Sequence, residues 1–127
     1  MSYTLMDMGS ENFEFRSNVW NWKATLEVIK SLDVVSEGLV REMSSNGTGV
    51  KVSSEESQLI GENIRKDILP QLEPNKRIYL NLSISDKPDD GVIYKDKEDE
   101  WRNYSADFYY LEEFSDFCTK SKGFQVY

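Results

Sequence analysis

The sequence predicts a mixed α+β fold, in which three main helices pack on a small, mostly antiparallel sheet. Two observations lead to this prediction: apolar residues recur every three or four positions in three segments, and they alternate with polar residues in others. Residues that favour turns separate these segments. Because 127 residues suit one domain, we expect a single domain over 1–127 with an acidic loop or hairpin at about 86–104.

The N-terminal part predicts strand followed by helix. The alternation Phe13-Glu14-Phe15-Arg16 indicates a strand, and residues 3–8 are compatible with another. A helix capped by Ser17 or Asn18 follows. Its apolar stripe consists of Val19, Trp22, Leu26, Ile29 and Leu32. Between residues 34 and 43 the pattern leaves both a short helix and an irregular crossing open.

A turn at Asn46-Gly47-Thr48-Gly49 and a brief strand at 50–52 precede the best-marked helix. That helix begins with a capping box, in which Ser53 and Glu56 satisfy each other's exposed amides. Pro70 predicts that it ends or kinks at the preceding residue. Its predicted buried face holds Leu59, Ile60, Ile64, Ile68, Leu69 and Leu72.

The C-terminal part predicts strand, charged loop, helix and strand. Residues 77–85 alternate and predict one strand, whereas 86–100 is rich in charges and turn residues and predicts a mobile loop or short hairpin. We expect the last helix to begin near Ser105, to end with Gly123 as a left-handed cap, and to precede a short edge strand at 124–127. The inner side of this helix is predicted to hold Phe108, Leu111, Phe114, Phe117 and Cys118.

The negative charge is concentrated in one part of the chain. Residues 86–116 hold 11 acidic and 4 basic side chains, a net charge of −7, within a total of −8. Nucleic acids and anionic membranes attract lysine and arginine, so we expect neither as a partner and predict a basic protein instead. The first residues contain neither a signal peptide nor a membrane-spanning run, which predicts a cytoplasmic location.

No catalytic apparatus is predicted from the residue types. The sequence has no histidine, so the common zinc ligand sets and hydrolytic triads cannot be built, and we expect no cofactor and no metal. Cys118, the single cysteine, falls on a predicted buried face and is expected to be structural. Carboxylate pairs are abundant, so a small enzyme that uses carboxylates and a divalent metal stays an alternative.

The acidic region is the candidate binding site. Its carboxylates would contact a basic partner, and its aromatic side chains would anchor the interface. The predicted contacts are Asp89, Asp90, Tyr94, Asp96, Glu98, Asp99, Glu100, Trp101, Glu112 and Glu113. For the chain itself we expect a monomer or a weak homodimer.

Three stretches carry a resemblance to known proteins: residues 15–22, 46–53 and 114–124. They resemble a small bacterial immunity-protein-like family of mostly uncharacterised proteins. The resemblance implies a compact mixed domain encoded beside a toxin, and it carries over no catalytic residue. The sequence departs from the family pattern where an aspartate commonly separates the asparagine and glycine of the 46–49 turn, and residues 77–104 match nothing in it.

Four functional hypotheses follow. The leading one is a non-enzymatic acidic binding protein that inhibits or neutralises a basic protein, as an immunity protein does with a toxin. A phage or mobile-element anti-defence inhibitor that mimics nucleic acid is the second, and the carboxylate and divalent-metal enzyme is the third. The fourth is a structural domain whose acidity serves only solubility.

Overall fold

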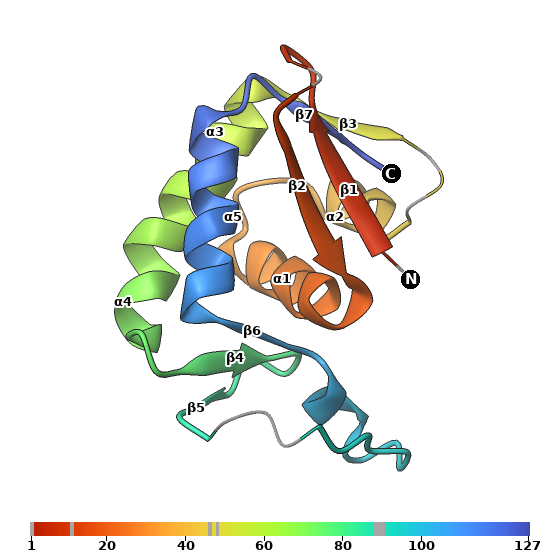
Figure 1. Cartoon of the computed structure of the whole chain (residues 1–127), viewed down its shortest axis with the longest axis vertical. Helices are drawn as coiled ribbons and strands as arrows, with labels where there is room; N and C mark the ends of the chain where they lie inside the picture. The colour runs from red at the N-terminus through yellow and green to blue at the C-terminus, as the bar shows by residue number, and fades with distance from the viewer. Residues whose placement is uncertain (1, 11, 46, 48, 88–90) are drawn as a thin grey trace.

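The computed structural model describes residues 2–10, 12–45, 47, 49–87 and 91–127 of the chain. These residues form a mixed α+β fold with two antiparallel sheets. Counting the continuous helical run 54–72 once, the described residues also contain four helices (Figure 1). The expected α+β class with antiparallel pairing is therefore confirmed, but there are two sheets and four helices where one sheet and three main helices were predicted.

The larger sheet joins the two ends of the chain. Its strand order is β2-β1-β7-β3, with every neighbouring pair antiparallel. The strands are β1 (Ser2–Asp7), β2 (Glu14–Asn18), β3 (Val50–Val52) and β7 (Phe124–Val126). Strand β7 is not the predicted edge strand, because it pairs with β1 on one side and β3 on the other.

Gly123 also has a different role from the one predicted. Helix α5 (Phe108–Lys120) ends at Ser121, which is extended, so Gly123 is not its left-handed cap. Gly123 has a φ of 98° at the entry to β7, and a Cβ there would lie 2.8 Å from the carbonyl oxygen of Val52. Positive φ and this close approach both require glycine.

The first two helices begin directly after their capping residues. Helix α1 (Val19–Leu32) begins where predicted, because the Asn18 side chain accepts a hydrogen bond from the Asn21 amide at 2.8 Å. Residues 34–43, which the pattern left open, contain helix α2 (Glu37–Met43), capped by Ser36.

The third helical run continues past its predicted end. Helix α3 (Ser54–Asn63) begins with the predicted capping box. It is followed by a π turn, η1 (Ile64–Ile68), and by α4 (Leu69–Leu72), so the run does not stop before Pro70. In the π turn the Leu69 amide donates to the Ile64 carbonyl, five residues back. The wider turn relieves the clash that Pro70 would cause in a regular α-helix.

The second sheet is small and has the order β5-β4-β6. Its strands are β4 (Arg77–Tyr79), β5 (Ile84–Ser85) and β6 (Ser105–Asp107). The single strand predicted at 77–85 is wrong, because the chain reverses between β4 and β5. Leu82 takes a φ of 70°, and the Asn81 side chain accepts hydrogen bonds from the Ser83 amide and hydroxyl. Asparagine stabilises turns in this way.

The start of the last helix is also corrected. Ser105 belongs to β6, which pairs with β4, and α5 begins three residues later at Phe108, capped by the Asp107 carboxylate. Of the five predicted inner residues, four are buried and Phe108 is half-buried. Between β6 and the preceding loop lies a short 3-10 helix, η2 (Glu100–Asn103).

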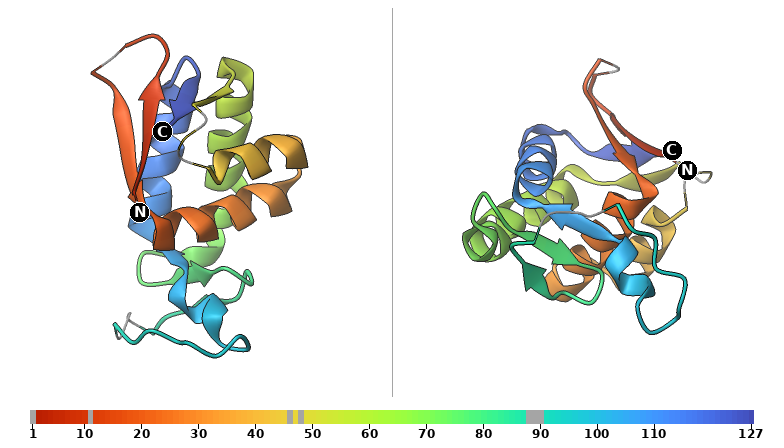
Figure 2. Two further views of the ribbon diagram at one scale, coloured as in Figure 1. Left: turned by 90° about the vertical axis from the view of Figure 1, so that its right-hand side faces the viewer. Right: turned by 60° about the horizontal axis from the view of Figure 1, so that its bottom comes forward.

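The core lies between the larger sheet and the helices (Figures 1 and 2). Trp22 of α1 is fully buried in it, and its indole Nε1 donates to the Met43 carbonyl at 2.9 Å, which fixes α2 against α1. Every buried side-chain nitrogen or oxygen in the described residues has a hydrogen-bond partner. In this same part of the chain, no helix is long and apolar enough to cross a membrane.

Candidate functional site

The candidate site lies on the small sheet and the loop that precedes β6. We call residues 76–87 and 91–107 the small lobe; it contains β4, β5, η2 and β6. The views in Figures 1 and 2 place it at one end of the molecule, away from the larger sheet and from both chain termini. Only three of its residues are buried: Ile78, Ser105 and Ala106.

The small lobe brings six of the ten predicted contact residues together. Asp96, Glu98 and Glu100 are exposed, whereas Tyr94, Asp99 and Trp101 are half-buried. Within this group the acidic side chains therefore lie mainly on the surface, as a protein contact requires, and the aromatic ones are partly held by neighbours. Asp89 and Asp90 lie outside the described residues.

Two aromatic residues of the lobe are positioned by specific contacts. The Asn103 side chain forms hydrogen bonds of 2.7 Å to both the amide and the carbonyl of Tyr94, which fixes the backbone there. Trp101 meets Tyr79 of β4 edge to face, with ring centroids 5.3 Å apart. Arg102 lies 5.0 Å above the Trp101 ring and pairs with Asp99 at 3.4 Å. The acidic loop is thus attached to the small sheet through its rings.

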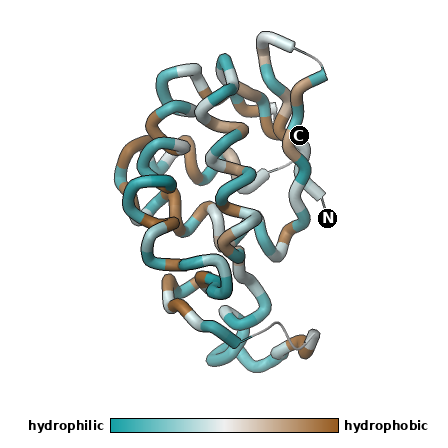
Figure 3. The backbone as a smooth tube through the Cα atoms, turned by 60° about the vertical axis from the view of Figure 1, so that its left-hand side comes forward, coloured by the Kyte–Doolittle hydropathy of each residue, from teal (hydrophilic) through white to brown (hydrophobic). Residues whose placement is uncertain are grey.

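Exposed apolar side chains gather on the same lobe. Nine large apolar residues are exposed in the described chain; Leu82, Ile84, Val92 and Ile93 belong to the small lobe, and Trp20 lies beside it at the start of α1. Ile93 is 65% exposed, the largest value among them. In Figure 3 the lower end of the tube is mostly hydrophilic, with short brown, hydrophobic segments between.

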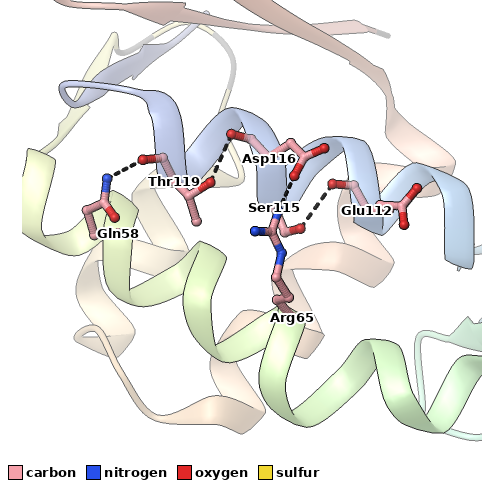
Figure 4. Close-up of polar contacts among 6 residues, drawn as sticks. All are labelled: Gln58, Arg65, Glu112, Ser115, Asp116 and Thr119. Carbon is pink, nitrogen blue, oxygen red and sulfur yellow. Dashed lines mark hydrogen bonds and ion pairs between the residues drawn. The ribbon is translucent and has the colours of Figure 1, made fainter.

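Glu112 and Glu113 are exposed but belong to a different surface. They lie on α5, and the ribbon views place α5 and η2 at opposite ends of β6. Figure 4 shows Glu112 one turn before Asp116, whose carboxylate pairs with Arg65 of η1 along the contact between the two helices. The structure therefore does not bring these two glutamates together with the acids of the loop.

A pocket of about 600 Å³ opens between the small lobe and the start of α1. Its size is in the range of small-molecule sites. Among its described lining residues, Arg77, Lys87 and Arg102 are cationic and no residue is acidic. Trp20, Tyr79, Tyr94 and Trp101 contribute aromatic walls.

The sequence analysis missed this pocket. Arg77 and Lys87 stand in segments that are neighbours only because the chain reverses at Leu82 and returns through β5. Trp20 comes from an element more than 50 residues earlier in the chain. One signal was present, because Trp20 stands outside the apolar stripe of its helix, but no pattern indicated what it faces.

The thiol of the single cysteine is enclosed in the fold. Cys118 is fully buried, and burial raises the pKa of its thiol, which opposes formation of the nucleophilic thiolate. In the described residues, no three histidine, cysteine or carboxylate side chains come together as a set that could hold a metal ion.

Comparison with protein-family models, with curated proteins and with solved structures finds no match to this chain.

Proposed function

We propose that the protein is a non-enzymatic binding protein whose small lobe contacts a basic protein partner and inhibits or neutralises it, as an immunity protein does with a toxin. One observation carries this proposal: exposed apolar side chains and exposed carboxylates share the small lobe. Val92 and Ile93 stand immediately before the acidic run that includes Asp96, Glu98 and Glu100. An apolar centre with a charged rim is the usual anatomy of a protein interface.

The described small lobe holds six acidic and six basic side chains, and it is the acidic run from Asp96 to Glu100 that favours a basic partner. A local run of negative charge attracts a cationic surface and disfavours acidic competitors. The positive side chains of the loop also matter for the alternative in which the acids mimic nucleic acid. Lys95, Lys97 and Arg102 interrupt the acidic run, which suits an individual protein surface better than imitation of a continuous row of phosphates.

The test is a charge reversal on the loop. We expect the triple variant Asp96→Lys, Glu98→Lys, Glu100→Lys to lose at least tenfold in affinity for the basic protein that the wild type retains from its native lysate at low salt. The affinity of the wild type should fall steeply as salt is raised, because exposed charges are screened. Affinity is measured by calorimetry with the purified partner once mass spectrometry has identified it.

The matched control reverses three exposed acids on other elements. The variant Glu42→Lys, Glu62→Lys, Asp67→Lys changes the net charge by the same amount on α2, α3 and η1. It should keep most of the affinity. Equal losses in the two variants would mean that only net charge matters, and unchanged affinity in the loop variant would refute the assignment of the binding surface.

A further inference from the structure

The described lining of the pocket at the start of α1 is cationic, whereas the small lobe around it mixes charges of both signs. The described small lobe holds six acidic and six basic side chains, yet the described lining of the pocket contains three cationic side chains and no carboxylate. Side chains that serve only solubility would be expected to mix both signs. Cations collected in a concave site bind anions.

Arg77 is the best-placed of these cations. It lies on β4, the central strand of the small sheet, in register with Ser85 and Asp107 on either side. Its Nη1 donates to the Ser105 hydroxyl at 2.6 Å, and it forms no ion pair with any described carboxylate. No buried side-chain nitrogen in the described residues lacks a partner, so its remaining nitrogens reach solvent. They can receive a phosphate or carboxylate, whose oxygens match the guanidinium fork.

The other cationic and polar residues of the pocket also favour an anionic ligand. Lys87 lines the pocket beyond the end of β5, and no described acid pairs with its ammonium. Arg102 also lines it, although Asp99 shares its charge. Asn21 of α1 is fixed in the wall by donation from its side chain to the Ser105 carbonyl at 2.8 Å. An arginine on the central strand, an exposed lysine and side-chain amides thus line one pocket.

Aromatic rings form another part of the wall. Trp101 is held edge to face by Tyr79 at 5.3 Å, and Trp20 is 42% exposed with its ring 5.2 Å from that of Tyr104. Planar groups of ligands stack on aromatic side chains of this kind. Inorganic phosphate would fill only a small part of the pocket volume of about 600 Å³. Only a larger ligand contacts both the cationic side chains and the aromatic rings.

We propose that this pocket binds a small organic anion that carries a planar ring, with its phosphate or carboxylate at Arg77 and Lys87 and its ring against the tryptophan walls. The pocket shares Val92 and Ile93 with the surface proposed for the protein partner, but this proposal rests on the cations and rings of the pocket and not on that partner. Nucleoside monophosphates and aromatic carboxylates share this chemistry.

Calorimetric titration of the full chain distinguishes nucleoside monophosphates from aromatic carboxylates as the ligand class. The ligands are adenosine, guanosine, cytidine and uridine monophosphates, the ring carboxylate anthranilate, and two incomplete probes: adenosine, which lacks the anion, and ribose 5-phosphate, which lacks the ring. We expect saturable binding by at least one ring-bearing anion, at least tenfold tighter than either incomplete probe. Binding by a nucleotide alone identifies phosphate as the anion, and binding by anthranilate alone identifies carboxylate.

Two variants locate the site. Arg77→Gln and Lys87→Gln should each weaken binding, Arg77→Gln by at least tenfold, while Arg41→Gln on α2 should leave it unchanged. Because Lys87 is exposed, its variant tests the site even if Arg77→Gln unfolds, which circular dichroism would show. The proposal is overturned if no ring-bearing anion binds below about 1 mM, if adenosine binds as tightly as its monophosphate, or if neither pocket variant weakens binding.

Discussion

The Asp7 side chain joins the end of β1 to the turn between α5 and β7. Its carboxylate accepts hydrogen bonds from the Ser121 hydroxyl at 2.6 Å, the Lys122 amide at 2.8 Å and the Gly9 amide at 2.9 Å. Burial by itself would raise the pKa of this carboxyl, but these donors outweigh that effect and hold the pKa below its ordinary value. The ionised form therefore fastens the end of β1 to the turn between α5 and β7.

We predict that Asp7→Asn lowers the free energy of unfolding by about 1–3 kcal/mol at pH 7, because an amide cannot accept all these bonds. A carboxyl whose pKa is lowered by folding stabilises the protein above its unfolded pKa of about 4 and loses that contribution as pH falls through the folded value. Urea unfolding at pH 7 and pH 3 should therefore show a smaller difference between variant and wild type at pH 3.

The control for this prediction is Asp67→Asn. Asp67 is exposed on η1, so its variant should match the wild type within about 0.5 kcal/mol at both pH values. An Asp7→Asn variant that lost the same stability at pH 3 as at pH 7 would show that ionisation of this carboxyl has no part in the effect.

At the scale of elements, α3 and α5 pack closely against each other at Gly61. Gly61 lies where the two helices meet, and a Cβ added there would be 2.8 Å from the Ser115 carbonyl oxygen and 2.9 Å from Cys118 Cβ. On the same interface, the Ser57 hydroxyl donates to the Cys118 carbonyl at 2.7 Å. The absence of a side chain at Gly61 allows the backbones to approach this closely.

We predict opposite effects for the same substitution in two helices. Gly61→Ala should destabilise the fold by about 1–3 kcal/mol, because overpacking against the α5 backbone outweighs the better helix propensity of alanine. Gly38→Ala on α2 meets only the Ser36 hydroxyl at 3.9 Å and should be neutral or stabilising by up to about 1 kcal/mol. Thermal and urea unfolding measure both; a stabilising Gly61→Ala would contradict the packing argument.

At the scale of the whole molecule, the two sheets differ in how much core they hold. The larger sheet and the helices contain nearly all the buried apolar residues, whereas the small lobe contributes only Ile78 and Ala106. Local opening costs least where few apolar contacts are buried. The part of the molecule that carries the candidate surface and pocket is thus also the part least held by core packing.

Hydrogen exchange read by mass spectrometry should show this difference. We predict that backbone amides of residues 77–87 and 91–104 exchange at least tenfold faster than those of α1 and α5, because their opening requires less than global unfolding. A ring-bearing anion in the pocket would slow exchange in the lobe selectively. Equal protection in the lobe and in α5 would indicate that the whole chain opens as one unit.

Local patterns predicted much of the larger sheet and the helices. The caps at Asn18 and Ser53 set the starts of α1 and α3, because a capping side chain acts within three residues of its own position. The apolar period of α5 predicted four of its five inner residues correctly. Hydrophobic periodicity and capping are local, so the order of residues contains them directly.

The proposed sites depended on contacts that local patterns do not contain. The sequence by itself determined the acidic run and its exposed position after a strand. Only the tertiary structure decided that Glu112 and Glu113 lie apart from that run, that β7 pairs on both sides, and that Arg77 and Trp20 share one pocket. The physical reason is that strand pairing and chain reversal join residues distant in the sequence, and their free energy depends on partners that no single segment specifies.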